Sequence, residues 1–209
     1  MRILVLVSGS GTNLQALIDA EKKGRFAPAG GSGPAGRIDA VISSRAGVYA
    51  LERARAAGIP ALTEEPDQGL PKKERRRELS DRILRIARER NAGLLVLAGF
   101  LSILEGDIIT GYAGRIINLH PSLLPKYGGE GMYGGRVHRA VLAAGEKESG
   151  CTVHMVDAGA DTGPVLLRRK VPVLEGDTPE SLAERIHAEE HIAIVDAVAA
   201  MIPRLTETR

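Results

Sequence analysis

The sequence has little cysteine, few aromatic residues and almost no excess charge. Among its 209 residues are one cysteine, no tryptophan, four tyrosines and two phenylalanines. The single Cys151 cannot form an intramolecular disulfide or a thiolate metal cluster, which suits a reducing compartment. A net charge of +2 and so few aromatic rings argue against a cationic, base-stacking surface. We therefore expect no nucleic-acid partner.

The chain also lacks long apolar runs. The N-terminal run over 3–7 is followed at once by Ser-Gly-Ser-Gly, so it is too short for the core of a signal peptide. No later stretch reaches the roughly 18 apolar residues of a membrane span. We expect a cytoplasmic protein without membrane contact. The length predicts one domain over residues 1–209, with a core domain and an appended lobe as the alternative, and the 44% apolar content is sufficient for a sizeable core.

What is present is an alternation of strand-like and helix-like segments. This alternation predicts an α/β fold with an open, mostly parallel, Rossmann-like sheet and helices on both faces. The β-rich segments late in the chain favour a mixed or antiparallel C-terminal part. The segment 24–36, rich in Gly, Pro and Ala, predicts a surface loop, with disorder as an alternative. Strands are expected over 3–7, 38–43, 59–63, 94–98, 115–119, 152–156 and 165–173, and helices over 13–23, 48–57, 72–90, 136–144 and 179–203.

A glycine-rich turn follows the first strand and opens the first helix. Gly9 and Gly11 begin a dinucleotide fingerprint, but Leu14 stands at its third glycine, and no acid ends the second strand. A nicotinamide enzyme is therefore disfavoured. Backbone N–H groups at a helix N-terminus, with the Thr12 and Asn13 side chains, suit a single phosphate, and a plain tight turn is the alternative.

Asn118 and His120 end a predicted strand together. Residues two apart on a strand point to the same side, so both side chains can face one cavity. Pro121 keeps His120 extended and ends the strand. An amide donor beside an imidazole suits a site that stabilises an oxyanion and moves a proton. The alternative is a structural histidine.

The segment 157–164 is an acidic turn between two β segments. Asp and Gly are common in turns, which is sufficient reason for their presence. Alternatively, a carboxylate such as Asp161 could raise the pKa of a nearby imidazole by charge pairing.

The segment 187–191 has the His-x-x-Glu-His pattern of one group of zinc peptidases. Its two histidines share a helix face. Only 18 residues follow, too few for the further acidic ligand and the cleft that such an enzyme needs. We therefore expect a polar patch near a substrate and no metal.

Taken together, these segments resemble the folate-dependent formyltransferase family, and within it the phosphoribosylglycinamide formyltransferases. The resemblance is carried by ILVLVSGSGTNLQALIDA, LVLAGFLSIL, YAGRIINLHPSLLPKY, ESGCTVHMVDAGADTGPVL and AERIHAEEH, in this order along most of the chain. It implies one formyltransferase domain, with a phosphate-binding half over 1–100 and a catalytic, folate-binding half over 101–209. It also implies small-molecule substrates and a monomer or homodimer.

The resemblance assigns three sets of residues. Asn118, His120 and Asp161 would form the catalytic trio. The substrate would be bound by Gly11, Thr12, Asn13, His187 and Glu190. The folate pocket would be lined by Phe100, Leu101, Ser102, Ile103, Leu104, Asn118, Asp157, Ala158, Gly159, Ala160 and Asp161.

The implied reaction is direct formyl transfer from 10-formyltetrahydrofolate, the cosubstrate, to the amine of 5'-phosphoribosylglycinamide. In this mechanism Asn118 and a protonated His120 stabilise a tetrahedral oxyanion, and Asp161 keeps the imidazole charged. No metal is involved.

The sequence departs from the family pattern at three places. Leu101 and Ser102 stand where the family has Met and Arg, and the loop 128–135 is longer than in the shorter members. Lys72 falls near a family arginine that meets the cofactor tail, but it is not assigned a role here because that stretch aligns poorly.

Other classes compete with this interpretation. Methionyl-tRNA formyltransferase, sugar-nucleotide formyltransferases and formyltetrahydrofolate hydrolase carry a further domain, for which 209 residues leave no room. A non-catalytic phosphometabolite-binding protein would use the same glycine-rich turn. It would give no reason for Asn118, His120 and Asp161 to occur together.

Overall fold

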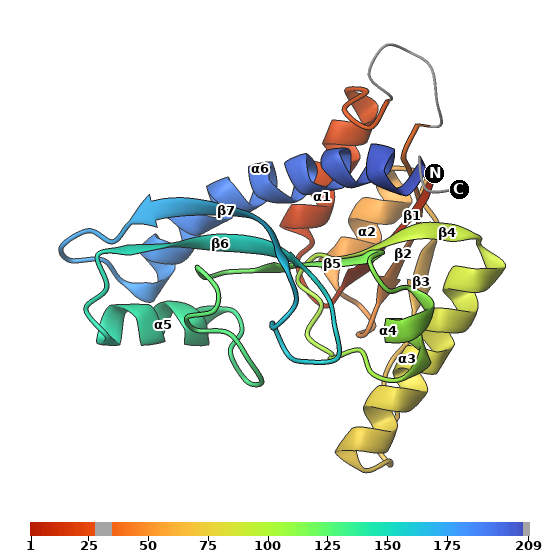
Figure 1. Ribbon diagram of the computed structural model, residues 1–209, viewed down its shortest axis with the longest axis horizontal. Coiled ribbons are helices and arrows are strands. Elements are labelled where there is room, and N and C mark those ends of the chain that lie inside the picture. Colours follow the sequence, from red (N-terminus) through yellow and green to blue (C-terminus); the bar gives the residue numbers. More distant parts are fainter. Residues whose placement is uncertain (28–34, 207–209) are drawn as a thin grey trace.

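The computed structural model describes residues 1–27 and 35–206, and in these ranges strands and helices alternate as predicted (Figure 1). Part of the predicted loop 24–36 lies outside the described residues. Of the described part, Phe26 is buried in the core and not on the surface. The elements are β1 (Arg2–Val7), α1 (Thr12–Lys22), β2 (Arg37–Ser43), α2 (Tyr49–Ala56), β3 (Ala61–Thr63), α3 (Lys72–Glu89), β4 (Ala92–Leu97), α4 (Asp107–Gly111), β5 (Ile116–His120), α5 (Gly135–Ala143), β6 (Glu148–Met155), β7 (Val165–Pro172) and α6 (Pro179–Thr206).

The described strands form one sheet in the order β3-β2-β1-β4-β5-β6-β7. The pairs from β3 to β5 are parallel. The pairs β5–β6 and β6–β7 are antiparallel. The predicted fold class, a mostly parallel sheet with an antiparallel C-terminal part, is confirmed.

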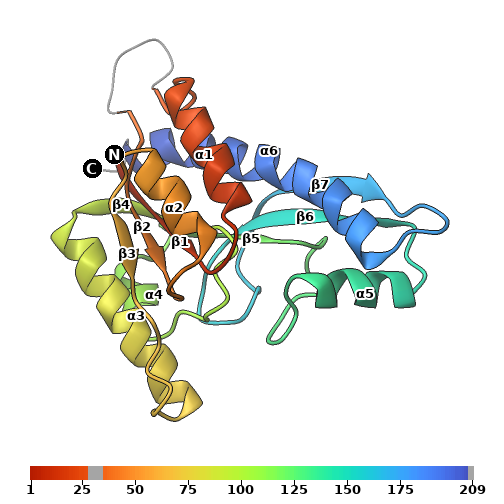
Figure 2. The ribbon, with the colours of Figure 1, turned by 180° about the vertical axis from the view of Figure 1, so that it is seen from behind.

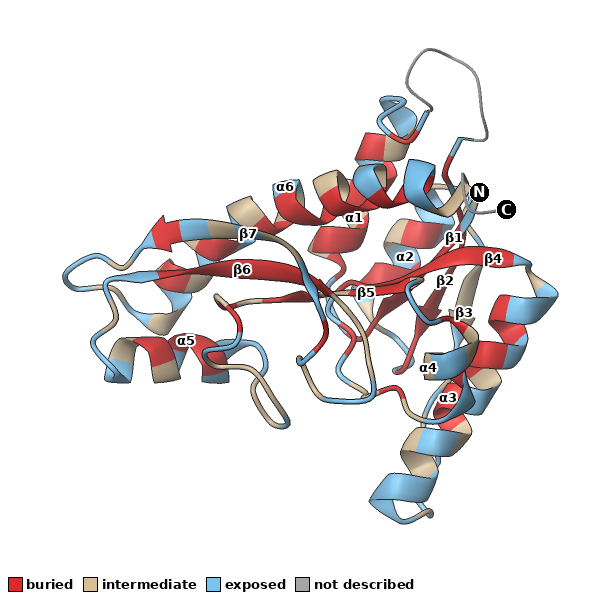
Figure 3. Cartoon of the chain, viewed as in Figure 1, coloured by how far each residue is buried: buried red, intermediate tan, exposed pale blue. Residues whose placement is uncertain are grey.

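Helices cover both faces of this sheet, which explains why the central strands are continuous apolar runs. One core cluster joins side chains of β1 and β4 to α1, α2, α5 and α6, and a second joins the opposite faces of these strands to α3 and α4. Figure 2 shows α1 and α2 in front of the first strands, and Figure 3 shows β4 and β6 buried along most of their length. Within the described ranges, no helix is long and apolar enough to cross a membrane.

The strand register determines which residues meet at the sheet edge. Leu97, the last residue of β4, lies beside Asn118 of β5. In the antiparallel pair, His154 of β6 lies opposite Asn118, and Thr152 lies opposite His120. Segments that follow β1, β4 and β5 therefore share one edge, where binding sites of open α/β sheets form.

Two predicted boundaries were wrong by three or more residues. β6 begins at Glu148, four residues before the predicted start. The prediction missed this part because Ser149 and Gly150 interrupt the apolar pattern of the strand. Gly150 is required there, since a Cβ would lie 1.9 Å from the Arg169 carbonyl oxygen. α6 continues past Pro203 to Thr206. Buried Ile202 anchors this last turn in the core, and the Thr206 hydroxyl donates to the Ile202 carbonyl oxygen at 3.1 Å.

Candidate active site

A cavity of about 770 Å³ lies at the shared edge where β1, β4 and β5 end. It brings together nearly all the residues that the sequence nominated. Those that line it are Gly11, Thr12, Asn13, Phe100, Leu101, Ser102, Ile103, Leu104, Asn118, His120, Asp157, Gly159, Ala160, Asp161, His187 and Glu190. Ala158, which is exposed in the same turn, does not line this cavity.

The glycine-rich turn opens α1 toward the cavity. Gly11 has the left-handed backbone conformation, with φ of 75°, and a Cβ there would lie 2.7 Å from the Ala50 Cβ. Only glycine fits this position without strain. The N–H groups of the first helical turn have no partner within the helix, and Thr12 and Asn13 line the cavity. This end of the cavity can therefore bind an anion.

The segment after β4 is fixed against this turn by a buried serine pair. The Ser8 and Ser44 hydroxyl oxygens lie 2.7 Å apart. The Leu101 N–H donates to the Ser8 oxygen at 2.9 Å. The wall formed by residues 100–104 thus has a fixed position relative to the end of β1.

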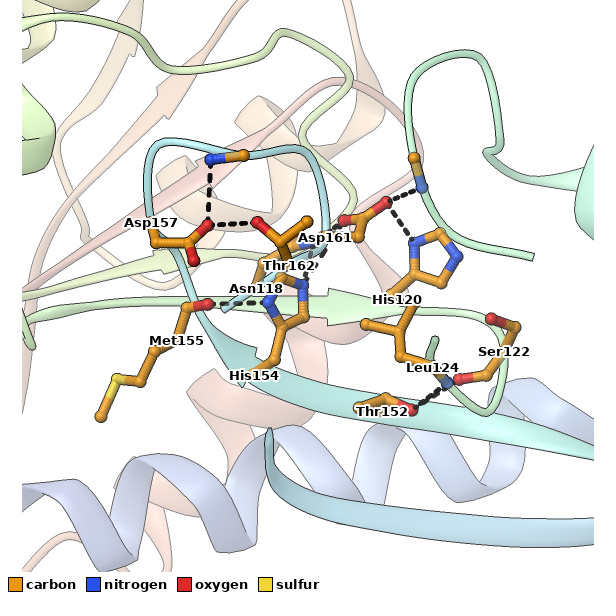
Figure 4. A network of polar contacts seen from close by, with 12 residues as sticks. Asn118, His120, Ser122, Leu124, Thr152, His154, Met155, Asp157, Asp161 and Thr162 are labelled. Carbon is orange, nitrogen blue, oxygen red and sulfur yellow. Dashed lines mark hydrogen bonds and ion pairs between the residues drawn. The ribbon is translucent and has the colours of Figure 1, made fainter. Parts of the chain in front are cut away.

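The three side chains of the nominated catalytic trio all line the same cavity. Figure 4 shows them close together. Asn118 and His120 are placed by β5, and Asp161 by the turn that follows β6. The His120 Nδ1 lies 3.4 Å from Asp161 Oδ2, and the Asn118 Nδ2 lies 3.4 Å from Asp161 Oδ1. A carboxylate, an imidazole and an amide can therefore act on one ligand atom.

Asp161 is positioned by a turn with little freedom. Its backbone is left-handed, with φ of 59°, and the Gly129 N–H donates to its Oδ2 at 2.9 Å. Gly163 passes so close to β6 that a Cβ would lie 2.0 Å from the Met155 carbonyl oxygen. Asp157 stabilises the same turn, because its Oδ1 accepts from the Thr162 hydroxyl at 2.6 Å.

Burial and neighbouring groups act in opposite directions on the pKa of His120. Burial lowers the pKa of His120, and the Asp161 charge and the Tyr127 carbonyl offset this only in part, so the pKa stays below its usual value. The Asp161 charge thus raises the pKa of His120, as expected, but burial has the larger effect. The His120 Nε2 lies 2.8 Å from the Tyr127 carbonyl oxygen, to which it donates. In the neutral ring the unprotonated nitrogen is then Nδ1, beside Asp161.

Asp161 itself remains a carboxylate. Burial alone would raise the pKa of Asp161, but contacts with His154, His120 and the Gly129 N–H outweigh this and lower it. The neutral imidazole therefore has a negative charge beside the nitrogen at which it takes up a proton.

The helix α6 contributes a buried carboxylate to the glycine-rich end. Glu190 Oε2 accepts from His187 Nδ1 at 2.7 Å and from Asn13 Nδ2 at 3.2 Å. Burial would raise the pKa of Glu190, but these partners lower it. Over 1–27 and 35–206, no cluster of His, Cys, Asp and Glu could hold a metal ion. The Asn13 Oδ1 is buried without a partner, so it can accept from a ligand.

Two histidines and two cationic residues are among the further residues that line the cavity and that sequence reasoning did not assign. His138 and His154 are buried, and as single histidines on α5 and β6 they had no motif; a polar residue in an apolar strand was the only signal for His154. Lys72 and Arg76 of α3 pair with Glu130 of loop 128–135, with 2.7 Å between Arg76 Nη2 and Glu130 Oε1.

With this geometry described, comparisons with known proteins identify the family. Residues 1–198 match the formyl transferase family. The chain belongs to this family. It is 41% identical over 191 residues to phosphoribosylglycinamide formyltransferase of Escherichia coli strain K12, covering 91% of this chain and 82% of that protein.

A longer protein and a solved structure are also similar to this chain. It is 42% identical over 201 residues to the trifunctional purine biosynthetic protein adenosine-3 of Drosophila melanogaster, covering 96% of this chain but only 14% of that protein. The crystal structure of glycinamide ribonucleotide transformylase 1 from Symbiobacterium toebii superposes with a TM-score of 0.85 at 41% identity, covering 98% of this chain and 88% of that one.

Proposed function

We propose that this protein transfers the formyl group of 10-formyltetrahydrofolate to the amine of 5'-phosphoribosylglycinamide, a step of purine synthesis. One observation carries the proposal: a single cavity joins an anion-binding helix N-terminus to Asn118, His120 and Asp161. The similarity to the Escherichia coli enzyme supports this choice of substrates. Both partners are small molecules.

In this proposal each ligand has its own end of the cavity. The substrate phosphate binds the N–H groups at Gly11, Thr12 and Asn13, and its glycinamide part reaches toward His187 and Glu190. The reduced folate lies against the segments 100–104 and 157–161. This arrangement directs the formyl carbon and the attacking amine toward the trio, where orientation lowers the barrier.

The chemistry follows from the protonation described above. The amine attacks the formyl carbon and a tetrahedral oxyanion forms, to which an Asn118 N–H donates. Neutral His120 takes the amine proton at Nδ1, and the Asp161 carboxylate stabilises the resulting imidazolium. The imidazolium then protonates the folate nitrogen while the bond between this nitrogen and the tetrahedral carbon breaks.

The test is absorbance-monitored release of folate from a 10-formyl folate analogue, with and without the ribonucleotide amine. Release that depends strictly on the amine supports the proposal. Release in its absence would indicate a hydrolase. No release under either condition would overturn the proposal and favour a phosphometabolite-binding protein.

A further inference from the structure

The turn that opens α1 lies between the cavity and the helix α2. Ser10 and Gly11 line the cavity, whereas no residue of α2, over 49–56, lines it. The helices α1 and α2 lie side by side (Figure 2). The backbone of Gly11 approaches α2 so closely that a Cβ there would lie 2.7 Å from the Ala50 Cβ. One side of the turn therefore faces α2, and the other side faces the cavity.

The carbonyl groups of this turn point toward α2 and are bound there. The Ala50 N–H donates to the Gly9 carbonyl oxygen at 3.2 Å. The Arg53 Nε–H donates to the Ser10 carbonyl oxygen at 2.9 Å. In a planar trans peptide unit the C=O and the N–H point in opposite directions. The N–H groups of Ser10 and Gly11 therefore point away from α2, toward the cavity, and among the described residues neither of them has an acceptor.

The Arg53 side chain is itself held in place by two further contacts. Its Nη1–H donates to Gln15 Oε1 of α1 at 3.1 Å, and its guanidinium carbon lies 4.7 Å from the centre of the Tyr49 ring. The guanidinium is positively charged, and the Ser10 and Gln15 oxygens that accept from it are neutral. Arg53 thus fixes the Ser10 carbonyl and places a positive charge behind the turn.

We propose that Arg53 is a positioning residue for the phosphate of the ribonucleotide, which orients the Ser10–Gly11 peptide so that the Gly11 N–H donates to this phosphate. The inference rests on the proposed function, in which the phosphate binds at this turn. Consecutive backbone N–H groups that converge on one point form a concave anion site. Without the Arg53 N–H the peptide is free to rotate, and a carbonyl oxygen turned toward the cavity would repel the phosphate.

Two substitutions separate the hydrogen bond from the charge. Arg53→Gln keeps an N–H donor at the position of Nε and removes the charge, whereas Arg53→Met removes both. We expect the KM for the ribonucleotide to rise about five- to tenfold in Arg53→Met with kcat nearly unchanged, because the hydrogen bond that orients the peptide is lost. Arg53→Gln should keep most of this hydrogen bond, so its KM should rise less than about threefold.

Two controls separate this effect from a general loss of structure. Arg55→Met is the matched variant, since Arg55 is an exposed residue of the same helix that pairs with Glu52 and not with the turn. Its KM for the ribonucleotide should be unchanged. The second control is the glycinamide ribonucleoside, which has no phosphate, and its KM should be the same in all variants.

An unchanged ribonucleotide KM in Arg53→Met, an equal rise for the ribonucleoside, or equal rises in Arg53→Met and Arg53→Gln would overturn the proposal. A second measurement does not depend on turnover. Titration with inorganic phosphate, followed by NMR at the Gly11 amide, should give a dissociation constant about five to ten times higher in Arg53→Met than in the wild type. Equal dissociation constants would overturn the proposal. Absence of turnover by the wild type would instead contradict the proposed function.

Discussion

The two walls of the cavity near the catalytic trio are built in different ways. The inner wall consists of β5 and β6, where His120 and His154 are buried within the sheet. The outer wall is formed by loop 129–135, which is joined to α3 by ion pairs of Glu130, 51% exposed, with Lys72 and Arg76. Exposed ion pairs contribute little to stability. The groups that we propose to react are therefore held by the packed sheet, whereas loop 129–135 is joined to α3 by exposed ion pairs.

The largest loss of activity is expected for a substitution of His120 in the inner wall. We expect His120→Ala to lower kcat by about 10²–10⁴, because the proton from the amine loses its acceptor. Steady-state kinetics with both substrates measures this loss, and the melting temperature shows whether the variant is folded. A folded variant with near wild-type kcat would exclude His120 as the proton acceptor.

A smaller loss is expected at Asn118. Asn118→Ala should lower kcat by about 10²–10³, the typical effect of one oxyanion donor. KM for the ribonucleotide should change much less, since its phosphate binds at the other end of the cavity. If KM rose and kcat were unchanged, Asn118 would be a ligand-binding residue and not an oxyanion donor.

The electrostatics of the inner wall can be tested by titration. The pKa of His120 is below its usual value because burial outweighs the Asp161 charge. An NMR titration of the ring should therefore have its midpoint below about 6.5, the unperturbed value. Asp161→Asn removes a contribution that raises this pKa, so the midpoint should fall further. A midpoint above the unperturbed value, or a rise in Asp161→Asn, would contradict the account.

The outer wall should give the smallest effect. Glu130→Gln removes the charge that joins the loop to Lys72 and Arg76, so we expect kcat and the melting temperature to be unchanged and the folate KM to change by less than about fivefold. These ion pairs lower the pKa of Glu130 to about 2, so it does not titrate between about pH 5 and 8. A large loss of kcat would show that the loop positions the reacting groups.

Local sequence patterns predict part of the inner wall. The continuous apolar runs of β1 and β4 indicate buried parallel strands, and the two-residue spacing of Asn118 and His120 predicts that they share a face. The antiparallel register that brings His154 opposite Asn118 depends on pairing across 36 residues, which no local pattern reveals.

The protonation of His120 could not be predicted for a related reason. A nearby carboxylate is visible in the sequence as a candidate partner, but the degree of burial is not. In the structure, the Asp161 charge raises the pKa of His120 as expected, but burial has the larger effect and the pKa is lowered overall. Likewise, Gly163 is visible in the sequence, but the reason why this position requires glycine is not. Only the structure shows that the Gly163 backbone lies close to the Met155 carbonyl oxygen.

The central claim is that this cavity transfers a formyl group to an amine and not to water. The most direct measurement follows an isotope-labelled formyl carbon from the folate donor by NMR, in the presence of the ribonucleotide amine. The account predicts that the label appears in a formamide on the glycinamide nitrogen. Label released as free formate, or retained on the folate, would contradict it.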